Sequence, residues 1–270
     1  MKKQFTLFAA TALAAMTVVP TIGFADDSAS KTPITYDSKG TVEFVAPTTP
    51  NKPLDPANPD SNKPLDPKNP DGTPSNPGTS GPLTLDLASS FDFGKQEITS
   101  VDQTYNASAQ RLGDGKYVPD YAQITDNRGT FAGWILSVKE TDSFHTSSNV
   151  ELKATQIKFA DLNHATTNTL KTDVTMPSAG FTLNPAGASV NIMSGAKAAD
   201  GKTNGTSGTH IIRFGNDNSL KTDTQANGEK RDNTVDPSVT LAVPGSSDKM
   251  AQKYTTTLQW TLGETPTTID

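Results

Sequence analysis

Apolar and polar residues alternate along the C-terminal stretch of the chain, residues 254–262. Tyr254, Leu258, Trp260 and Leu262 occupy even positions, and threonine or glutamine fills every odd position. Side chains two residues apart in a β-strand point to the same face. The alternation therefore predicts a half-buried antiparallel strand whose apolar face carries both Trp260 and Leu262.

A second stretch, residues 126–138, is apolar on both of its expected faces. One face carries Ala132, Trp134, Leu136 and Val138, and the other carries Phe131 and Ile135. Strands that are buried on both faces show such continuous apolar runs. We therefore predict a central strand that is covered on both sides, with Trp134 and Leu136 on the same face.

Further short apolar runs are separated by clusters of Gly, Asn, Asp and Ser, and no segment sustains a helical spacing. Strands are predicted at residues 83–87, 91–93, 122–125, 132–139, 157–159, 190–193, 210–214, 239–243 and 253–262. One short helix is expected around residues 142–152, where Asp142 or Ser143 offers an N-cap. Many short strands between turn residues are typical of sandwiches and barrels. The expected fold is an all-β, antiparallel β-sandwich or barrel-like domain over residues 83–263.

The N-terminal residues 1–25 have the pattern of a secretory signal peptide. Lys2 and Lys3 precede an apolar core over residues 5–19, and small residues stand three and one positions before the expected cleavage site, at Gly23 and Ala25. The apolar core is too short to favour a stable membrane span. We expect a secreted mature chain that does not span the membrane; the alternative is an uncleaved anchor.

Two segments separate the signal peptide from the main domain. Residues 26–46 contain two apolar pieces around a turn sequence, which predicts a short N-terminal β-piece on the edge of the domain, since an isolated hairpin is marginal in water. Residues 47–82 are rich in proline and carry an 11-residue repeat that begins at Asn51 and again at Asn62. Proline blocks helix and ladder hydrogen bonds, so a disordered Pro-rich linker is expected. A loop that belongs to the domain is the alternative.

Composition and charge narrow the possible partners. The formal charge is −6, and the mature chain without Lys2 and Lys3 is more negative still, which argues against a nucleic-acid partner. The same net charge argues against bulk attraction to anionic polymers, so binding to such a polymer would need local contacts. The chain contains no cysteine, so it has neither disulfides nor thiolate chemistry. The sequence contains no Leu-Pro-x-Thr-Gly sorting signal, so covalent anchoring at the cell surface is not expected.

The sequence contains no convincing motif for catalysis or for metal binding. Ser194 and Lys197 match Ser-x-x-Lys, but the other signatures of acyl-serine enzymes lie within a few residues of them, whereas in such enzymes they are far apart in sequence. His145, His164 and His210 are dispersed without metal-ligand spacing. We therefore expect no enzyme activity, no cofactor and no metal.

The two Trp-x-Leu triplets carry a family resemblance. Trp134 follows the sequence Asp-Asn-Arg-Gly-Thr, and Trp260 follows a Thr-rich strand; together they resemble the WxL domain of surface proteins from low-GC Gram-positive bacteria. The resemblance covers about residues 81–262 and implies non-covalent attachment to the cell wall by peptidoglycan binding. It also implies that a membrane-anchored surface protein is a possible partner, so docking onto such a protein is the alternative function.

The resemblance makes Trp134, Leu136, Trp260 and Leu262 the candidate binding residues. Two interpretations of the tryptophans remain open. Both rings can be part of the core, because tryptophan on the apolar face of a strand is most often buried there. Alternatively, one ring is exposed and stacks against the C–H face of a sugar.

Overall fold

The computed structural model describes residues 35–170, 173–199, 201–202, 205–224 and 230–264. The chain divides into two units, residues 1–44 and residues 45–270. The expected signal peptide lies outside the described residues. In the described part of the chain, no helix is long and apolar enough to cross a membrane.

The second unit is built from short strands and a single described 3₁₀ turn, η1 (Asp217–Ser219), which confirms the all-β prediction. Its strands are β1 (Pro67–Lys68), β2 (Leu83–Ala88), β3 (Gln103–Ser108), β4 (Gln110–Leu112), β5 (Tyr117–Val118), β6 (Tyr121–Asp126), β7 (Trp134–Glu140), β8 (Gln156–Phe159), β9 (Leu162–Thr166), β10 (Val174–Thr175), β11 (Phe181–Leu183), β12 (Val190–Gly195), β13 (Gly208–Phe214), β14 (Lys221–Thr224), β15 (Lys230–Val243) and β16 (Leu258–Gly263).

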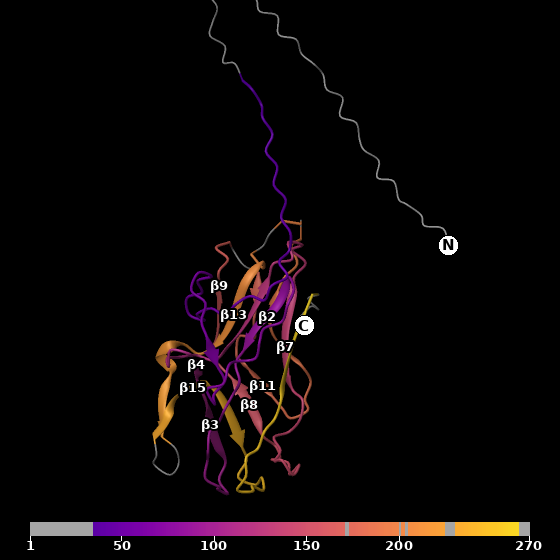
Figure 1. Cartoon of the computed structure of the whole chain (residues 1–270). Coiled ribbons are helices and arrows are strands. Elements are labelled where there is room, and N and C mark those ends of the chain that lie inside the picture. The colour runs from indigo at the N-terminus through magenta and orange to yellow at the C-terminus, as the bar shows by residue number, and fades with distance from the viewer. Residues whose placement is uncertain (1–34, 171–172, 200, 203–204, 225–229, 265–270) are drawn as a thin grey trace, which may run out of the picture. The chain divides into compact units, whose positions relative to one another are not determined.

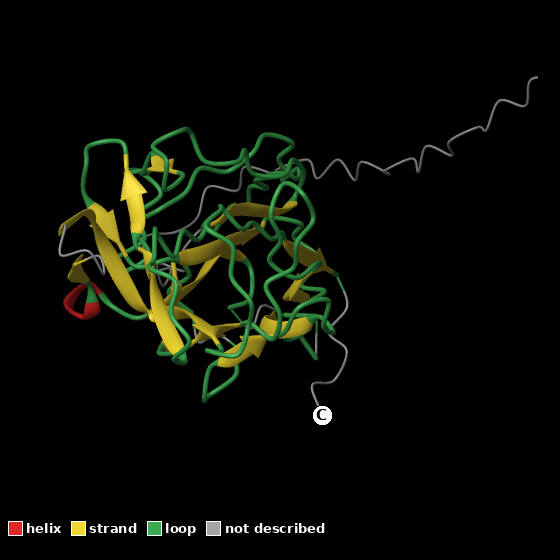
Figure 2. Cartoon of the chain, turned by 90° about the horizontal axis from the view of Figure 1, so that it is seen from below, coloured by secondary structure: helices red, strands yellow, loops and turns green. Residues whose placement is uncertain are grey.

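Small antiparallel sheets form a ring around the interior of this unit (Figures 1 and 2). Three of them have the strand orders β10-β12-β7-β16, β2-β6-β13-β9 and β11-β8-β15-β14, with β3 also paired to β15. The smallest has the order β1-β4-β5. Strands distant in sequence are therefore neighbours in space, as expected for an antiparallel all-β domain.

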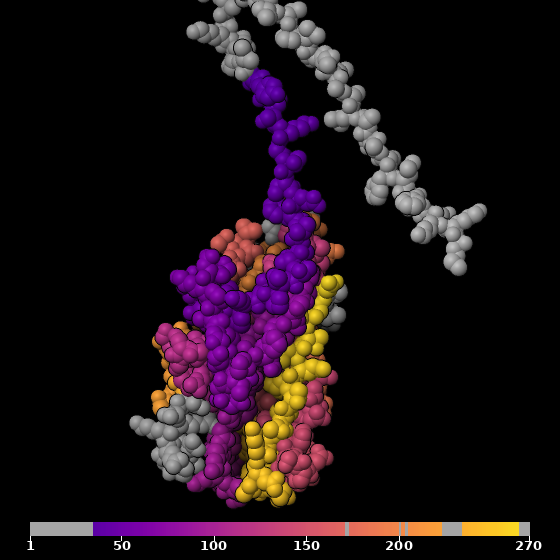
Figure 3. All heavy atoms as spheres, in the orientation of Figure 1, coloured from indigo at the N-terminus to yellow at the C-terminus, as the bar shows by residue number. Residues whose placement is uncertain are grey.

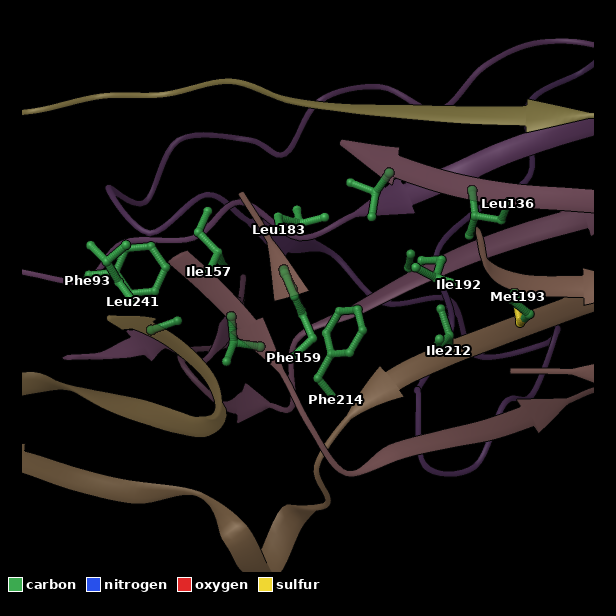
Figure 4. Packing of buried hydrophobic residues seen from close by; sticks show 14 of the residues in the cluster. Phe93, Leu136, Ile157, Phe159, Leu183, Ile192, Met193, Ile212, Phe214 and Leu241 are labelled. Atoms are coloured by element: carbon green, nitrogen blue, oxygen red, sulfur yellow. The ribbon is translucent and has the colours of Figure 1, made fainter. Parts of the chain in front are cut away.

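The core lies where the inner faces of these sheets meet (Figure 4). Phe159 is at its centre, stacked on Phe181 with ring centroids 4.4 Å apart and tilted against Phe214 at 4.9 Å. Ile157 of β8 and Ile212 of β13 are fully buried in the same cluster. β8 buries alternate residues, whereas β13 is buried on both faces, with Ile211 in a second cluster.

The predicted central strand is confirmed in β7, which lies between β12 and β16. Trp134, Leu136 and Val138 are completely buried, and Ile135 on the opposite face is nearly so. The last predicted strand is shorter than expected. Residues 253–257 form only an isolated bridge at Thr255, and the regular ladder begins at Leu258.

The proline-rich segment differs from the expected free linker because it packs on the domain. Leu54 is buried against Leu87, Tyr121 and Ile211. The Leu54 amide donates to Oε1 of Gln123 over 2.7 Å, and Gln123 Nε2 donates to the Lys52 carbonyl over 2.9 Å. Prolines remove ladder donors, but the residues between them keep their polar groups, and Leu54 supplies a buried apolar contact.

The expected N-terminal β-piece falls partly on residues that the structure does not describe. Its described part, residues 35–46, forms no strand, and the side chains of Tyr36, Val42, Phe44 and Val45 are exposed. The addition of this piece to the edge of the main domain stays a prediction.

Two local expectations were wrong. Residues 142–152 contain no helix: His145 instead bridges both Glu151 and Thr255, and Asn149 has a positive φ of 62° that ends any helical path. Residues 91–93 form no strand, although Phe93 is buried and packs edge-to-face with Phe144. In both places, contacts between distant residues decided the backbone conformation.

Candidate functional site

The two Trp-x-Leu triplets lie side by side on neighbouring antiparallel strands. In the register of β7 and β16, Trp260 is opposite Val138 and Leu262 is opposite Leu136. The triplets are far apart in sequence, but antiparallel pairing brings them to one sheet (Figure 1). The family motif therefore corresponds to one continuous structural feature.

Trp134 is a core residue. Its side chain is completely buried, and its Nε1 donates a hydrogen bond of 2.8 Å to the Thr206 carbonyl. The indole ring lies 5.2 Å from the ring of His210, on β13. Because a buried indole N–H needs an acceptor, this bond fixes the orientation of the ring. No face of Trp134 is available to a ligand.

Two glycines make room for this tryptophan. A Cβ on Gly195, which is opposite Trp134 in β12, would lie 2.6 Å from the indole Cε2. Gly133 has a positive φ of 73°, and a Cβ there would lie 2.7 Å from the Gly195 carbonyl oxygen. Glycine at position 133 adopts this positive φ without strain, and glycine at position 195 leaves room for the Trp134 ring across the ladder.

Arg128 connects the ends of both tryptophan strands. Its guanidinium makes two hydrogen bonds to the Asp126 carboxylate, at 2.9 and 2.8 Å, and a third of 2.7 Å to the Gly133 carbonyl. Glu264, directly after β16, lies 3.7 Å from the same guanidinium. The hydrogen-bonded carboxylate raises the pKa of Arg128. This buried, bidentate pair braces the turn before β7.

Trp260 and Leu262 differ from the first triplet because they are only half-buried. Their side chains pack on the edge of the core cluster, while Gln259 and Thr261 between them are exposed. Figure 3 shows the C-terminal segment, in yellow, running along the surface of the molecule. Of the four candidate binding residues, Trp134 and Leu136 are therefore enclosed, and Trp260 and Leu262 are accessible in part.

β16 is an edge strand with an unpaired side. The Thr141 amide donates to the Thr257 carbonyl, so residues 257, 259 and 261 direct their backbone groups toward β7. In an antiparallel ladder, the alternate residues point the other way. The N–H and C=O groups of Leu258, Trp260 and Leu262 consequently lie on the outer edge, where the described residues provide no hydrogen-bond partner.

Glu140, at the end of β7, is a buried carboxyl on the same face as Trp134. It is opposite Leu258 of β16, and neither of its oxygens has a hydrogen-bond partner among the described residues. Burial raises the pKa of Glu140 to about 7, because removal from water penalises the charged form. The junction between the two tryptophan strands therefore contains a group that titrates near neutral pH.

His164 and His210 meet in the structure, which their spacing in sequence did not indicate. Nε2 of His164 lies 3.1 Å from Nδ1 of His210, and the rings are stacked. Burial lowers the pKa of His210 to about 4, with a smaller contribution from His164. Among the residues that the structure describes, no group of three or more His, Cys, Asp or Glu side chains could hold a metal ion.

The Ser-x-x-Lys sequence does not have the geometry of an acyl-serine enzyme. Ser194 lies in strand β12, where its hydroxyl is 2.8 Å from that of Thr175. An acyl-serine nucleophile opens a helix, and residues 190–195 form a strand that is paired with β7. Ser194 therefore has a structural position in the sheet.

A shallow polar hollow adjoins the segment that leads into β16. It is lined by Ser147, Gln252, Lys253 and Thr255. Three of these residues come shortly before β16, which begins at Leu258. None of the residues that line the hollow is aromatic. Trp260 is the aromatic residue of β16.

Comparison with protein families gives one match, the WxL domain, described as a surface cell wall-binding domain, over residues 31–266. Neither curated proteins nor solved structures gave a match. The matched range includes both tryptophan strands, the proline-rich segment and the residues that precede it. The chain therefore belongs to the family of WxL domain surface proteins that bind the cell wall.

Proposed function

We propose that this protein is a secreted, non-enzymatic surface protein that attaches non-covalently to the Gram-positive wall by binding peptidoglycan. The family match to a cell wall-binding domain over residues 31–266 carries this proposal. The expected signal peptide at residues 1–25 supplies the route of export. The net negative charge of the chain makes specific local contacts necessary, because anionic wall polymers repel it.

The surface of β16 is our candidate for the contact with the wall. Trp260 and Leu262 are half-exposed there, and the polar hollow beside Lys253 adjoins the start of the strand. An indole face packs well on the C–H face of a sugar ring, and Lys253 could pair with a carboxylate of the stem peptide. In this arrangement, buried Trp134 and Leu136 support β16 from the neighbouring strand.

Co-sedimentation with washed sacculi tests this assignment. The mature chain, residues 26–270, should pellet with sacculi, and Trp260→Phe should weaken retention about fivefold, which corresponds to roughly 1 kcal/mol of aromatic contact. Gln259→Ala is the matched control, because Gln259 is the exposed neighbour on the opposite face. Thermal melts establish that both variants are folded. Equal retention of all three proteins would place the wall contact on another surface.

A second candidate function is docking onto a membrane-anchored partner of the same surface complex. The unpaired backbone edge of β16 favours it, because an unpaired edge is a template for strand addition by another protein. Sacculi stripped of protein distinguish the two functions. They retain the chain if it binds peptidoglycan, and they fail to retain it if a protein partner is required.

A further inference from the structure

The 11-residue repeat of the proline-rich segment has no part in the functions proposed above. Its first copy begins at Asn51 and its second at Asn62, and both copies open with the same six residues, Asn-Lys-Pro-Leu-Asp-Pro. Figure 3 shows this segment, in indigo, on the surface of the domain. Leu54 of the first copy is buried, whereas Leu65 of the second is half-buried. The domain thus carries two identical six-residue segments, of which only the first inserts its leucine into the sheet.

The site that holds the first copy combines an apolar contact with three hydrogen bonds. The apolar part consists of three side chains from β2, β6 and β13, namely Leu87, Tyr121 and Ile211. Gln123 accepts from the Leu54 amide over 2.7 Å and donates to the Lys52 carbonyl over 2.9 Å. The Asn51 side chain donates to Thr84 Oγ1 over 3.0 Å. We call this set of groups the repeat site.

Each of these contacts uses a group that the second copy also has. Two of the hydrogen bonds involve backbone groups, the N–H of the leucine and the C=O two residues before it. The third hydrogen bond involves the side chain of the first asparagine. In the second copy, the same groups belong to Leu65, Lys63 and Asn62. The contacts at the repeat site therefore do not distinguish the two copies.

We propose that the repeat site binds either copy, so that the segment slips by 11 residues and docks through Leu65 in place of Leu54. The chain is long enough for this slip. The Thr79 amide donates to the Leu85 carbonyl on β2, and the chain from Pro67 to Thr79 can extend to about 40 Å. β2 and β6 are adjacent strands, only about 5 Å apart.

The first copy is the preferred occupant, because the second copy has contacts of its own. The Gly113 amide donates to the Asp66 carbonyl over 2.8 Å, and β1, which lies in the second copy, pairs with β4. A slip breaks these contacts, so the slipped form is the minor state. Any change that weakens the packing of Leu54 shifts the population toward it.

The slip changes the length of the free chain and leaves the sheets intact. Release of residues 51–61 adds 11 residues upstream of the docked copy. In polyproline II geometry, at about 3.1 Å per residue, these residues add about 34 Å of reach. The N-terminal part of a surface protein thereby gains reach when one bound segment is exchanged for an identical one. This property goes beyond wall attachment and does not depend on it.

Disulfide trapping in the mature chain measures which copy is docked, because the natural chain has no cysteine. Asn51→Cys with Thr84→Cys reports the first copy, since these side chains are in contact, and Asn62→Cys with Thr84→Cys reports the second. We expect the 51–84 disulfide to form quickly and the 62–84 disulfide to form more slowly. Adding Leu54→Ala, which weakens the competing copy, should accelerate the 62–84 disulfide by about tenfold.

The dependence on leucine separates docking from chance encounters of the two cysteines. Adding Leu65→Ala to the 62–84 pair should slow its disulfide by about tenfold, because the second copy then lacks its apolar contact. A 62–84 disulfide that never forms, even with Leu54→Ala, overturns the proposal. A 62–84 disulfide that forms equally fast with Leu65→Ala overturns it as well.

A double-mutant cycle without cysteines is the second test. The wild type, Leu54→Ala, Leu65→Ala and the double variant are unfolded in urea. The second copy replaces the first mainly in the Leu54→Ala protein, so Leu65→Ala should lower the free energy of unfolding more in that background than in the wild type. Equal effects of Leu65→Ala in the two backgrounds contradict the slip.

Discussion

Glycine at position 195 shows how a single residue determines the tryptophan site. Its missing side chain leaves the space in which the Trp134 ring lies, and the ring in turn reaches the Thr206 carbonyl. The ring also meets His210, so glycine, indole and imidazole form one packed group. A motif that reads as Trp-x-Leu in sequence therefore depends on residues outside it.

We expect Gly195→Ala to lower the free energy of unfolding by about 1–3 kcal/mol, because the new methyl group overpacks the ring. Denaturant unfolding followed by tryptophan fluorescence measures the effect. Gly263→Ala is the control, since a Cβ there meets nothing within 4 Å, and it should change stability by less than about 0.5 kcal/mol. Equal effects of the two substitutions would mean that the indole can shift freely.

Buried Glu140 makes stability depend on pH. Its pKa is about 7 in the folded protein, against an ordinary value of 4.5, so the folded state holds the proton more tightly than the unfolded state. The free energy of unfolding therefore falls as pH rises from about 4.5 to about 7 and then levels off. Burial raises the pKa of Asp236 to about 6, so this group also lowers the free energy of unfolding as pH rises. Burial lowers the pKa of His210 to about 4, so this group has the opposite effect and raises the free energy of unfolding as pH rises above about 4.

Glu140→Gln should remove part of this pH dependence. The free energies of unfolding of the variant and the wild type should differ least near pH 4. By pH 8, the free energy of unfolding of the variant should exceed that of the wild type by on the order of 2 kcal/mol. Urea unfolding of both proteins at several pH values gives the two slopes. Parallel slopes would show that Glu140 is hydrated in solution and does not titrate as a buried group.

At the scale of elements, the docked proline-rich segment is the largest departure from expectation. Its two repeat copies have the same sequence at most positions but different environments. Leu54 of the first copy is buried, whereas the equivalent Leu65 of the second is only half-buried. Gln123, which holds the first copy, is itself buried and also donates to Asp86 over 2.9 Å. The sheet thus holds the first copy through the buried contact of Leu54 and through the hydrogen bonds of Gln123.

Leu54→Ala should release the first repeat copy from the sheet. We expect the free energy of unfolding to fall by about 2 kcal/mol. This value is at the lower end of the range for a buried leucine, because the site is near the surface. Limited proteolysis should then cut residues 47–66 faster than in the wild type. Leu65→Ala is the matched control and should leave both stability and cleavage nearly unchanged. Faster cleavage in both variants would indicate that the segment is held as a whole and not by Leu54.

At the scale of the whole molecule, the net charge predicts how wall binding responds to salt. The chain is acidic, and the proposed contact is an aromatic stacking surface on β16. Retention on sacculi should therefore change less than about twofold between 0.05 and 0.5 M salt, because screening acts mainly on charge pairs. A steep fall with salt would show that an ionic contact, and not the β16 surface, carries the binding.

The sequence by itself determined the fold class and the two tryptophan strands. The alternation in residues 254–262 and the apolar run around Trp134 are local signals, because side-chain direction follows backbone geometry within one strand. The same signals correctly predicted β2, β6, β8, β12 and β13. They missed eight strands, most of them polar or very short, whose pairing depends on neighbours: β1, β3, β4, β5, β9, β10, β11 and β14.

Only the tertiary structure decided which tryptophan is enclosed. Both have a leucine two residues later, but β7 has a strand on each side, whereas β16 has one neighbour, so Trp134 is covered and Trp260 is half-exposed. The meeting of His164 with His210 and the docking of Leu54 likewise depend on residues far apart in sequence. Local patterns specify the faces of strands, and burial depends on which faces meet.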